Sequence, residues 1–161
     1  MQGSGTETVA ITNNTVRQYN LNGINVVTRL GAPTLNATIT GNTIGNPGAF
    51  ALNGILVSAG ASSALPDAGL ICAGIGGAGA LANAITGAGT NGADPTATDF
   101  RVRQRFSTTV RLPGYVGLAG DTTAVVAFVK ANNGVTPTGS ATAAFPATGG
   151  GFVGGAACPT P

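Results

Sequence analysis

Three alternating arginines are the side chains in this 161-residue chain that are best placed to act together. Arg101, Arg103 and Arg105 are two residues apart, so in an extended strand they project from one face. Guanidinium groups bind carboxylate, sulfate or phosphate oxygens, often through paired hydrogen bonds. The row therefore predicts either a solvated face or an anion-binding stripe for an acidic glycan, lipopolysaccharide or another protein.

The sequence offers few residues for catalysis. The chain has no histidine, so neither a Ser-His-Asp triad nor a Cys-His pair can form. Glycoside hydrolysis needs two carboxylates a few ångströms apart, but each acid has a local explanation. Asp121 suits a helix N-cap, Asp99 opens a strand, Asp67 and Asp94 adjoin prolines in loops, and Glu7 is near the terminus. No catalytic residue, metal site or cofactor is predicted.

The two cysteines, Cys72 and Cys158, are far apart and have no zinc or redox spacing. They are either two unrelated buried thiols or one disulfide that ties the C-terminal tail to the body. A disulfide would fit an exported protein.

Composition favours many short strands joined by tight turns. Only 7% of residues are charged, so long helices with ion-paired outer faces are not expected. The 27 glycines and the frequent Thr, Val and Asn suit turns and strands. A net charge of +2 is too weak to indicate a nucleic-acid partner, and no apolar run is long enough for a membrane span.

A weak repeat runs along the chain, consisting of an Asn-x-aliphatic tripeptide followed by an alternating strand. Stacked coils bury such inward residues as one continuous column, which a single coil cannot do. The repeat predicts a β-solenoid, with a β-sandwich or barrel as the alternative. The tripeptides begin at Asn14, Asn42 and Asn83, and the alternating strands include 24–26, 55–57 and 100–102.

An aliphatic residue also precedes the tripeptide. Ile11 and Ile39 stand five residues before Val16 and Ile44. In the third unit Ala80 is expected at this place, after the glycine-rich stretch 74–79, which we interpret as a loop or close-packed turn.

The coils around Asn14, Asn42 and 54–55 look like those of right-handed parallel β-helix proteins of bacteria. More distinctively, residues 99–106, 108–115 and 149–155 resemble the C-terminal end of large repetitive bacterial surface proteins of this class. The resemblance covers roughly residues 8 to 160. It implies the fold and export, and it implies no catalytic residues.

The C-terminal third changes character. Asp121, the valines that follow it and Gly134 predict one helix from 121 to 133 that covers an open end of the solenoid. Residues 135–161 are expected to form an irregular tail, anchored by Phe145 and Phe152.

These observations predict an all-β fold, a short right-handed parallel β-helix with one C-terminal capping helix. We expect a terminal extension at 1–7, solenoid coils at 8–118, and the cap and tail at 119–161. The expected function is a structural or adhesive module of an exported bacterial surface protein, located at the cell surface. Its partners would be neighbouring coils of a longer chain or copies of itself. The alternative function is binding or degradation of a polysaccharide.

Overall fold

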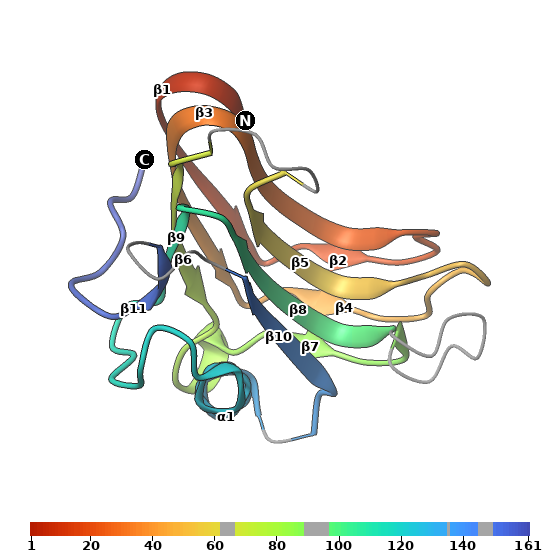
Figure 1. Cartoon of the computed structure of the whole chain (residues 1–161). Coiled ribbons are helices and arrows are strands. Elements are labelled where there is room, and N and C mark those ends of the chain that lie inside the picture. Colours follow the sequence, from red (N-terminus) through yellow and green to blue (C-terminus); the bar gives the residue numbers. More distant parts are fainter. Residues whose placement is uncertain (62–66, 89–96, 135, 145–149) are drawn as a thin grey trace.

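Successive coils of the chain stack in parallel and form a short right-handed β-helix (Figure 1). The computed structural model describes residues 1–61, 67–88, 97–134, 136–144 and 150–161. The fold class predicted from the repeat is confirmed. Among the described residues, no helix combines the length and apolar character that crossing a membrane requires.

The strands form three walls around a common interior. The first wall has the order β1, the second half of β3, β6, β9 and β11. The second wall has the order β2, β4, β7, and the third has the first half of β3, then β5, β8 and β10. The elements are β1 (Gln2–Thr12), β2 (Thr15–Val16), β3 (Asn22–Thr40), β4 (Thr43–Ile44), β5 (Asn53–Ala59), β6 (Leu70–Ile75), β7 (Ala84–Ile85), β8 (Thr98–Arg105), β9 (Thr109–Arg111), α1 (Thr122–Asn133), β10 (Gly139–Ala144) and β11 (Gly151–Val153), with a 3-10 turn at Gly79–Leu81.

The predicted apolar columns are present in the strand register. Inward residues of equivalent coils lie side by side and are buried, apart from the partly buried Val16 in the first coil, so each coil covers the apolar side chains of the next. The columns include Val16–Ile44–Ile85 in the second wall, and Ile24–Ile55–Phe100 and Val26–Val57–Val102 in the third.

One position in the third coil differs from the prediction. Ile39 is paired with Ile75 and not with Ala80. The reason is that β6 ends at Ile75, Gly76 adopts a φ of 77°, and the additional residues form the 3-10 turn before β7. Part of the glycine-rich stretch is thus strand, and the rest is a turn.

The solenoid also extends further at both ends than the apolar pattern indicated. β1 already begins at Gln2, ahead of the expected first coil at residue 8. The expected irregular tail contributes β10, which pairs with β8, and β11, which pairs with β9. The start of β1 and all of β10 are rich in Gly, Ala, Ser and Thr and lack bulky alternation, so their pairing depends on backbone groups at existing strand edges. β11 is too short, at three residues, to show an alternating pattern.

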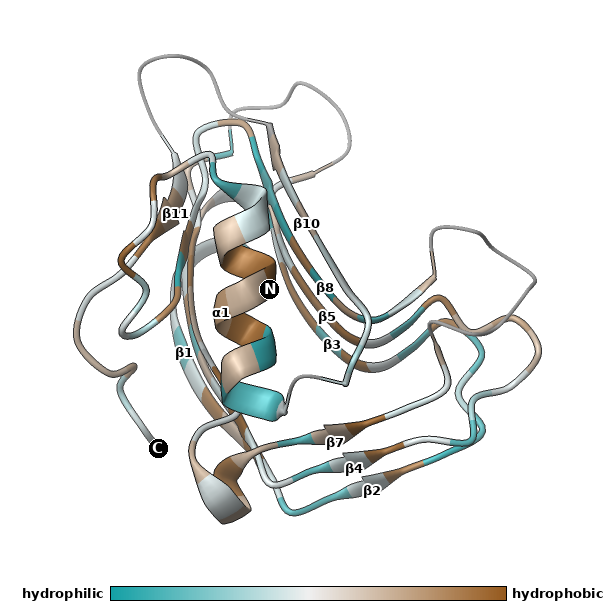
Figure 2. Cartoon of the chain, turned by 90° about the horizontal axis from the view of Figure 1, so that it is seen from below, coloured by the Kyte–Doolittle hydropathy of each residue, from teal (hydrophilic) through white to brown (hydrophobic). Residues whose placement is uncertain are grey.

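Helix α1 lies across the C-terminal end of the coils, between the first and third walls (Figure 2). The Asp121 carboxylate accepts a hydrogen bond from the Ala124 amide at 2.8 Å, and Gly134 ends the helix with a φ of 81°. Val125 and Val129 are completely buried against the core. The predicted helix, its cap and its covering position are confirmed.

Cys72 and Cys158 are joined by a disulfide. Cys72 lies on β6 beside Asn36 of β3 and Arg111 of β9, and both cysteines are buried. The bond therefore holds the tail after β11 against the first wall. Phe152 of β11 is buried in the core, whereas Phe145 lies outside the described residues.

The covering role of the helix predicts a position-dependent loss of stability. Val129→Ala should lower the free energy of unfolding by about 2–3 kcal/mol, because it opens a cavity under the helix. Val126→Ala makes the same chemical change at a half-buried position of α1 and should cost less. Urea unfolding followed by circular dichroism measures both, and equal losses would contradict this packing.

Reduction of the disulfide should lower the free energy of unfolding by roughly 4–5 kcal/mol, because the bond closes a loop of 86 residues. Urea unfolding with and without reductant measures this difference. A Cys72→Ala, Cys158→Ala variant should be insensitive to reductant. An unchanged midpoint on reduction of the parent chain would show that the bond adds no stability.

Candidate functional site

A ladder of asparagines at the corner between the first and second walls joins the coils. Asn14 donates from its backbone amide and its Nδ2 to Asn42 Oδ1, both at 3.0 Å. Asn42 donates in the same way to Asn83 Oδ1 at 3.1 and 2.9 Å, and Asn83 to Asn133 Oδ1 at 3.0 and 2.7 Å. The backbone and side-chain amides of Asn14, Asn42 and Asn83 therefore donate to the asparagine of the next coil towards the C-terminus.

The same asparagines also bond back to the preceding coil. Nδ2 of Asn42 donates to the carbonyl of Ile11 at 2.8 Å, and Nδ2 of Asn83 donates to that of Ile39 at 2.8 Å. Because Asn42 and Asn83 are almost fully buried, these hydrogen bonds satisfy polar groups that would otherwise be costly. Each rung thus has a fixed set of partners on both sides.

The last rung comes from the capping helix and not from a strand. Asn133 ends α1, and its Nδ2 donates to the Ile75 carbonyl at 3.1 Å, which repeats the bond made in earlier coils. Gly76 permits this approach, because a side chain at Gly76 would collide with the Asn132 carbonyl and the Asn133 side chain. The C-terminal end of the ladder is therefore fully bonded.

The N-terminal end of the ladder is open. Asn14 is exposed, and within the described ranges its Oδ1 accepts no hydrogen bond. Its Nδ2 bonds to Thr12 and Asn42, but the carbonyl of a preceding coil is missing from its partners. Asn14 consequently has the bonding pattern of an inner rung on one side only.

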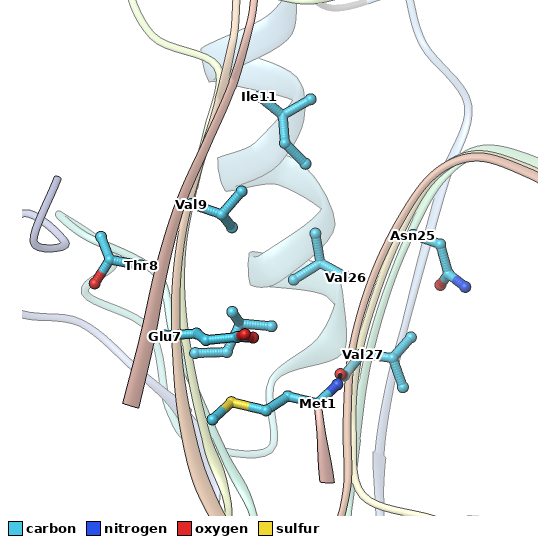
Figure 3. Close-up of a pocket in the computed structure, with 9 residues that line it drawn as sticks. Met1, Glu7, Thr8, Val9, Ile11, Asn25, Val26 and Val27 are labelled. Atoms are coloured by element: carbon cyan, nitrogen blue, oxygen red, sulfur yellow. Dashed lines mark hydrogen bonds between the residues drawn. The ribbon is translucent and has the colours of Figure 1, made fainter. Parts of the chain in front are cut away.

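An apolar hollow of about 600 Å³ adjoins this open end (Figure 3). Val9, Ile11 and Val26 point into it from β1 and β3, while Thr8 and Asn25 point away. Val9 and Ile11 are only half-buried, although their counterparts in the next coil, Ala37 and Ile39, are completely buried. The hollow, which we call the mouth, is the uncovered end of the core columns.

Glu7 stands in the mouth at a position that is apolar in every later coil. Its side chain points inward from β1 (Figure 3), and the strand register places it at the head of a column of apolar side chains. The Glu7 carboxylate is hydrated while no other segment covers the mouth. Burying it without a partner would cost free energy. The rest of the column is Leu35, Ile71, Val110 and Phe152.

The predicted arginine row lies on the outer side of β8, away from the core. Its neighbours on β5 and β10 are Leu56 and Ser140 beside Arg101, and Ser58 and Thr142 beside Arg103. Arg103 Nε donates to Ser58 Oγ at 3.1 Å.

Electrostatic repulsion acts within this row. Burial, followed by repulsion from Arg105, Arg101 and Arg29, lowers the pKa of Arg103 to about 10. Burial, Arg101 and Arg29 also lower the pKa of Arg105. Arg29, at the bend of β3, therefore adds a fourth cation to the predicted three.

The acidic residues that the structure describes make their contacts away from the arginine row. Asp99 is buried and accepts from the Thr138 amide at 2.8 Å and hydroxyl at 2.9 Å. Asp67 is buried and accepts from the Ala61 amide at 2.5 Å. Asp121 caps α1 and Glu7 lies in the mouth, whereas Asp94 lies outside the described residues.

Three features of these sites were not predicted: Asn133 as a rung of the ladder, Arg29 beside the row, and Glu7 in the mouth. Asn133 was assigned to the helix, but no spacing in the sequence relates it to Asn83 as a rung of the ladder. Arg29 follows the alternating strand that begins at Ile24, and a register alignment with Arg105 could have indicated its place.

No family model matches this chain, and neither a curated protein nor a solved structure matches it. Proposals about its function therefore depend on the geometry of its own residues.

The ladder predicts unequal costs for the same substitution. Asn83→Ala should lower the free energy of unfolding by about 2–4 kcal/mol, because it leaves buried partners in two coils unsatisfied. Asn14→Ala is the matched control at the open, hydrated end and should cost less than about 1 kcal/mol. Urea unfolding of both variants tests this, and similar losses would contradict a ladder that is closed at one end and open at the other.

Proposed function

We propose that this chain is a structural module that forms the capped end of a β-solenoid at a cell surface. In this proposal the open N-terminal edge receives a further coil, and helix α1 ends the stack at the other side. Its role is structural: it terminates the solenoid and presents its outer faces at the cell surface.

The difference between the two ends is the observation that carries the proposal. At the C-terminal end, Asn133 completes the ladder, and Val125 and Val129 cover the columns. At the N-terminal end, Asn14 has no hydrogen-bond partner above it among the residues that the structure describes, and Val9 and Ile11 are partly uncovered. Solenoids need a cap because a terminal coil exposes its core and unpaired strand edges.

A coil of a longer solenoid fits the mouth better than a second copy of this chain. Head-to-tail stacking of copies would meet α1 instead of a free coil. Head-to-head stacking would bring two Glu7 carboxylates together inside an apolar column. An inward charge at a strand edge is a known way to prevent such self-association.

Two further features support a location outside the cell. The Cys72–Cys158 disulfide is typical of oxidising compartments. The resemblance of the segment from 99 to 115 to bacterial β-helix surface proteins points the same way.

The direct experiment adds one coil at the open edge. The extended chain consists of residues 1–40 followed directly by residues 13–161, so that residues 13–40 occur twice. The first copy of 29–40 then occupies the position that β1 has in the parent chain, and β1 stacks on top of it. We expect a monomer with a stronger β signal in circular dichroism and a Tm higher by about 5 °C, because solenoid stability grows with each stacked interface.

A matched control carries Ile39→Glu in the added copy only, which buries a carboxylate in a column that is apolar in every coil, Ile11–Ile39–Ile75. It should lose the gain in Tm. If the extended chain instead melts at the parent's Tm and protease removes the added residues, the edge does not accept a coil and the proposal fails.

A further inference from the structure

The arginine row on β8 is a concentration of positive charge that the fold itself does not explain. The chain has 7 Lys and Arg residues, and Arg29, Arg101, Arg103 and Arg105 are close enough to repel one another. Within the described residues, none of these four guanidinium groups is paired with a carboxylate, and Arg101 Nε is buried without a hydrogen-bond partner. Like charges that are held together without counterions cost stability.

Protection of a sheet edge does not account for the row. Charged residues often guard exposed edge strands, but β8 is paired on one side with β5 and on the other with β10. The charges therefore lie in the middle of the third wall, where no strand can add to them. The row is also fixed in place, because residues on a paired strand keep a regular spacing of about 7 Å between alternate side chains.

The neighbours of the row suit the binding of oxyanions. Ser140 and Thr142 of β10 flank it and are only half-buried, so hydroxyl groups that can donate hydrogen bonds lie beside the guanidinium groups. Arg103 uses Nε to bond Ser58, which orients its planar end and leaves its terminal nitrogens for a carboxylate or sulfate.

We propose that Arg29, Arg101, Arg103 and Arg105 form a binding site for a linear acidic polysaccharide whose carboxylate or sulfate groups lie along β8. Binding would supply the missing counterions and relieve the repulsion within the row. The proposal does not depend on the capped-solenoid function, because it uses the outer side of the third wall and not the mouth.

A polysaccharide fits this surface better than a nucleic acid. The whole chain carries a net charge of only +2, and outside the row the remaining cations are Arg17, Arg111 and Lys130. Nucleic-acid binding usually relies on an extended basic face that neutralises many phosphates. A short row of cations suits a polymer with fewer, more widely spaced charges.

The chain itself provides a matched control for the test. Replacing Arg101, Arg103 and Arg105 by Gln gives the row variant, and replacing Arg17, Arg111 and Lys130 by Gln gives a control with the same net charge. The probes are polygalacturonate for carboxylates, heparin for sulfates, neutral dextran and a single-stranded oligonucleotide. Affinity is measured by isothermal titration at several salt concentrations.

We expect the parent chain to bind polygalacturonate or heparin more tightly than dextran or the oligonucleotide. The row variant should lose about tenfold or more in affinity and show a weaker salt dependence, while the control should change less than about twofold. Preference for one acidic polymer identifies carboxylate or sulfate as the ligand group.

Three results would overturn the proposal: no binding of either acidic polymer, equal losses in the row and control variants, or tighter binding of the oligonucleotide. If the row variant does not fold, the parent chain still gives an answer by NMR. Addition of the acidic polymer should shift the side-chain Nε–H signals of the row and leave those of Arg17 and Arg111 in place. Shifts of equal size at all arginines would contradict a defined site.

Discussion

Hydrogen bonding between equivalent asparagines keeps the coils in register, and the rest of the structure depends on that register. Because Asn42 and Asn83 bond to both neighbouring coils, a shift of one coil would break buried bonds on two sides. The fixed register brings Ile over Ile and Val over Val, so the apolar columns are continuous. In a chain with only 7% charged residues, this repetition orders the coils.

The two ends of the solenoid differ in how the terminal coil's apolar columns are covered. At the C-terminal end a helix covers the columns and supplies an asparagine at the position of the next rung. At the N-terminal end the columns are uncovered, and Glu7 takes an inward position that is apolar elsewhere. Any element that covers the open end must therefore accommodate a carboxylate.

Charge is scarce in this protein, and its distribution is therefore informative. The described acids cap a helix, accept hydrogen bonds from loop amides or face the mouth, and none of them neutralises the arginines of β8. The fold tolerates their mutual repulsion on a strand paired on both sides. Such a cost in stability is commonly found where a surface is used for binding.

The sequence by itself determined the repeat, the inward residues of the strands at 24–26, 55–57 and 100–102, and the helix with its Asp121 cap, because each follows from local spacing and residue type. The strands of the tail were not predicted. The Gly, Ala and Ser of β10 form a strand only where a neighbouring edge offers hydrogen bonds, and the three residues of β11 are too few to show a pattern. Only the tertiary structure decided that Asn133 is a rung, that Arg29 joins the row and that Glu7 faces the core. These three facts depend on which coils lie side by side, and loops of unequal length conceal that register in the sequence.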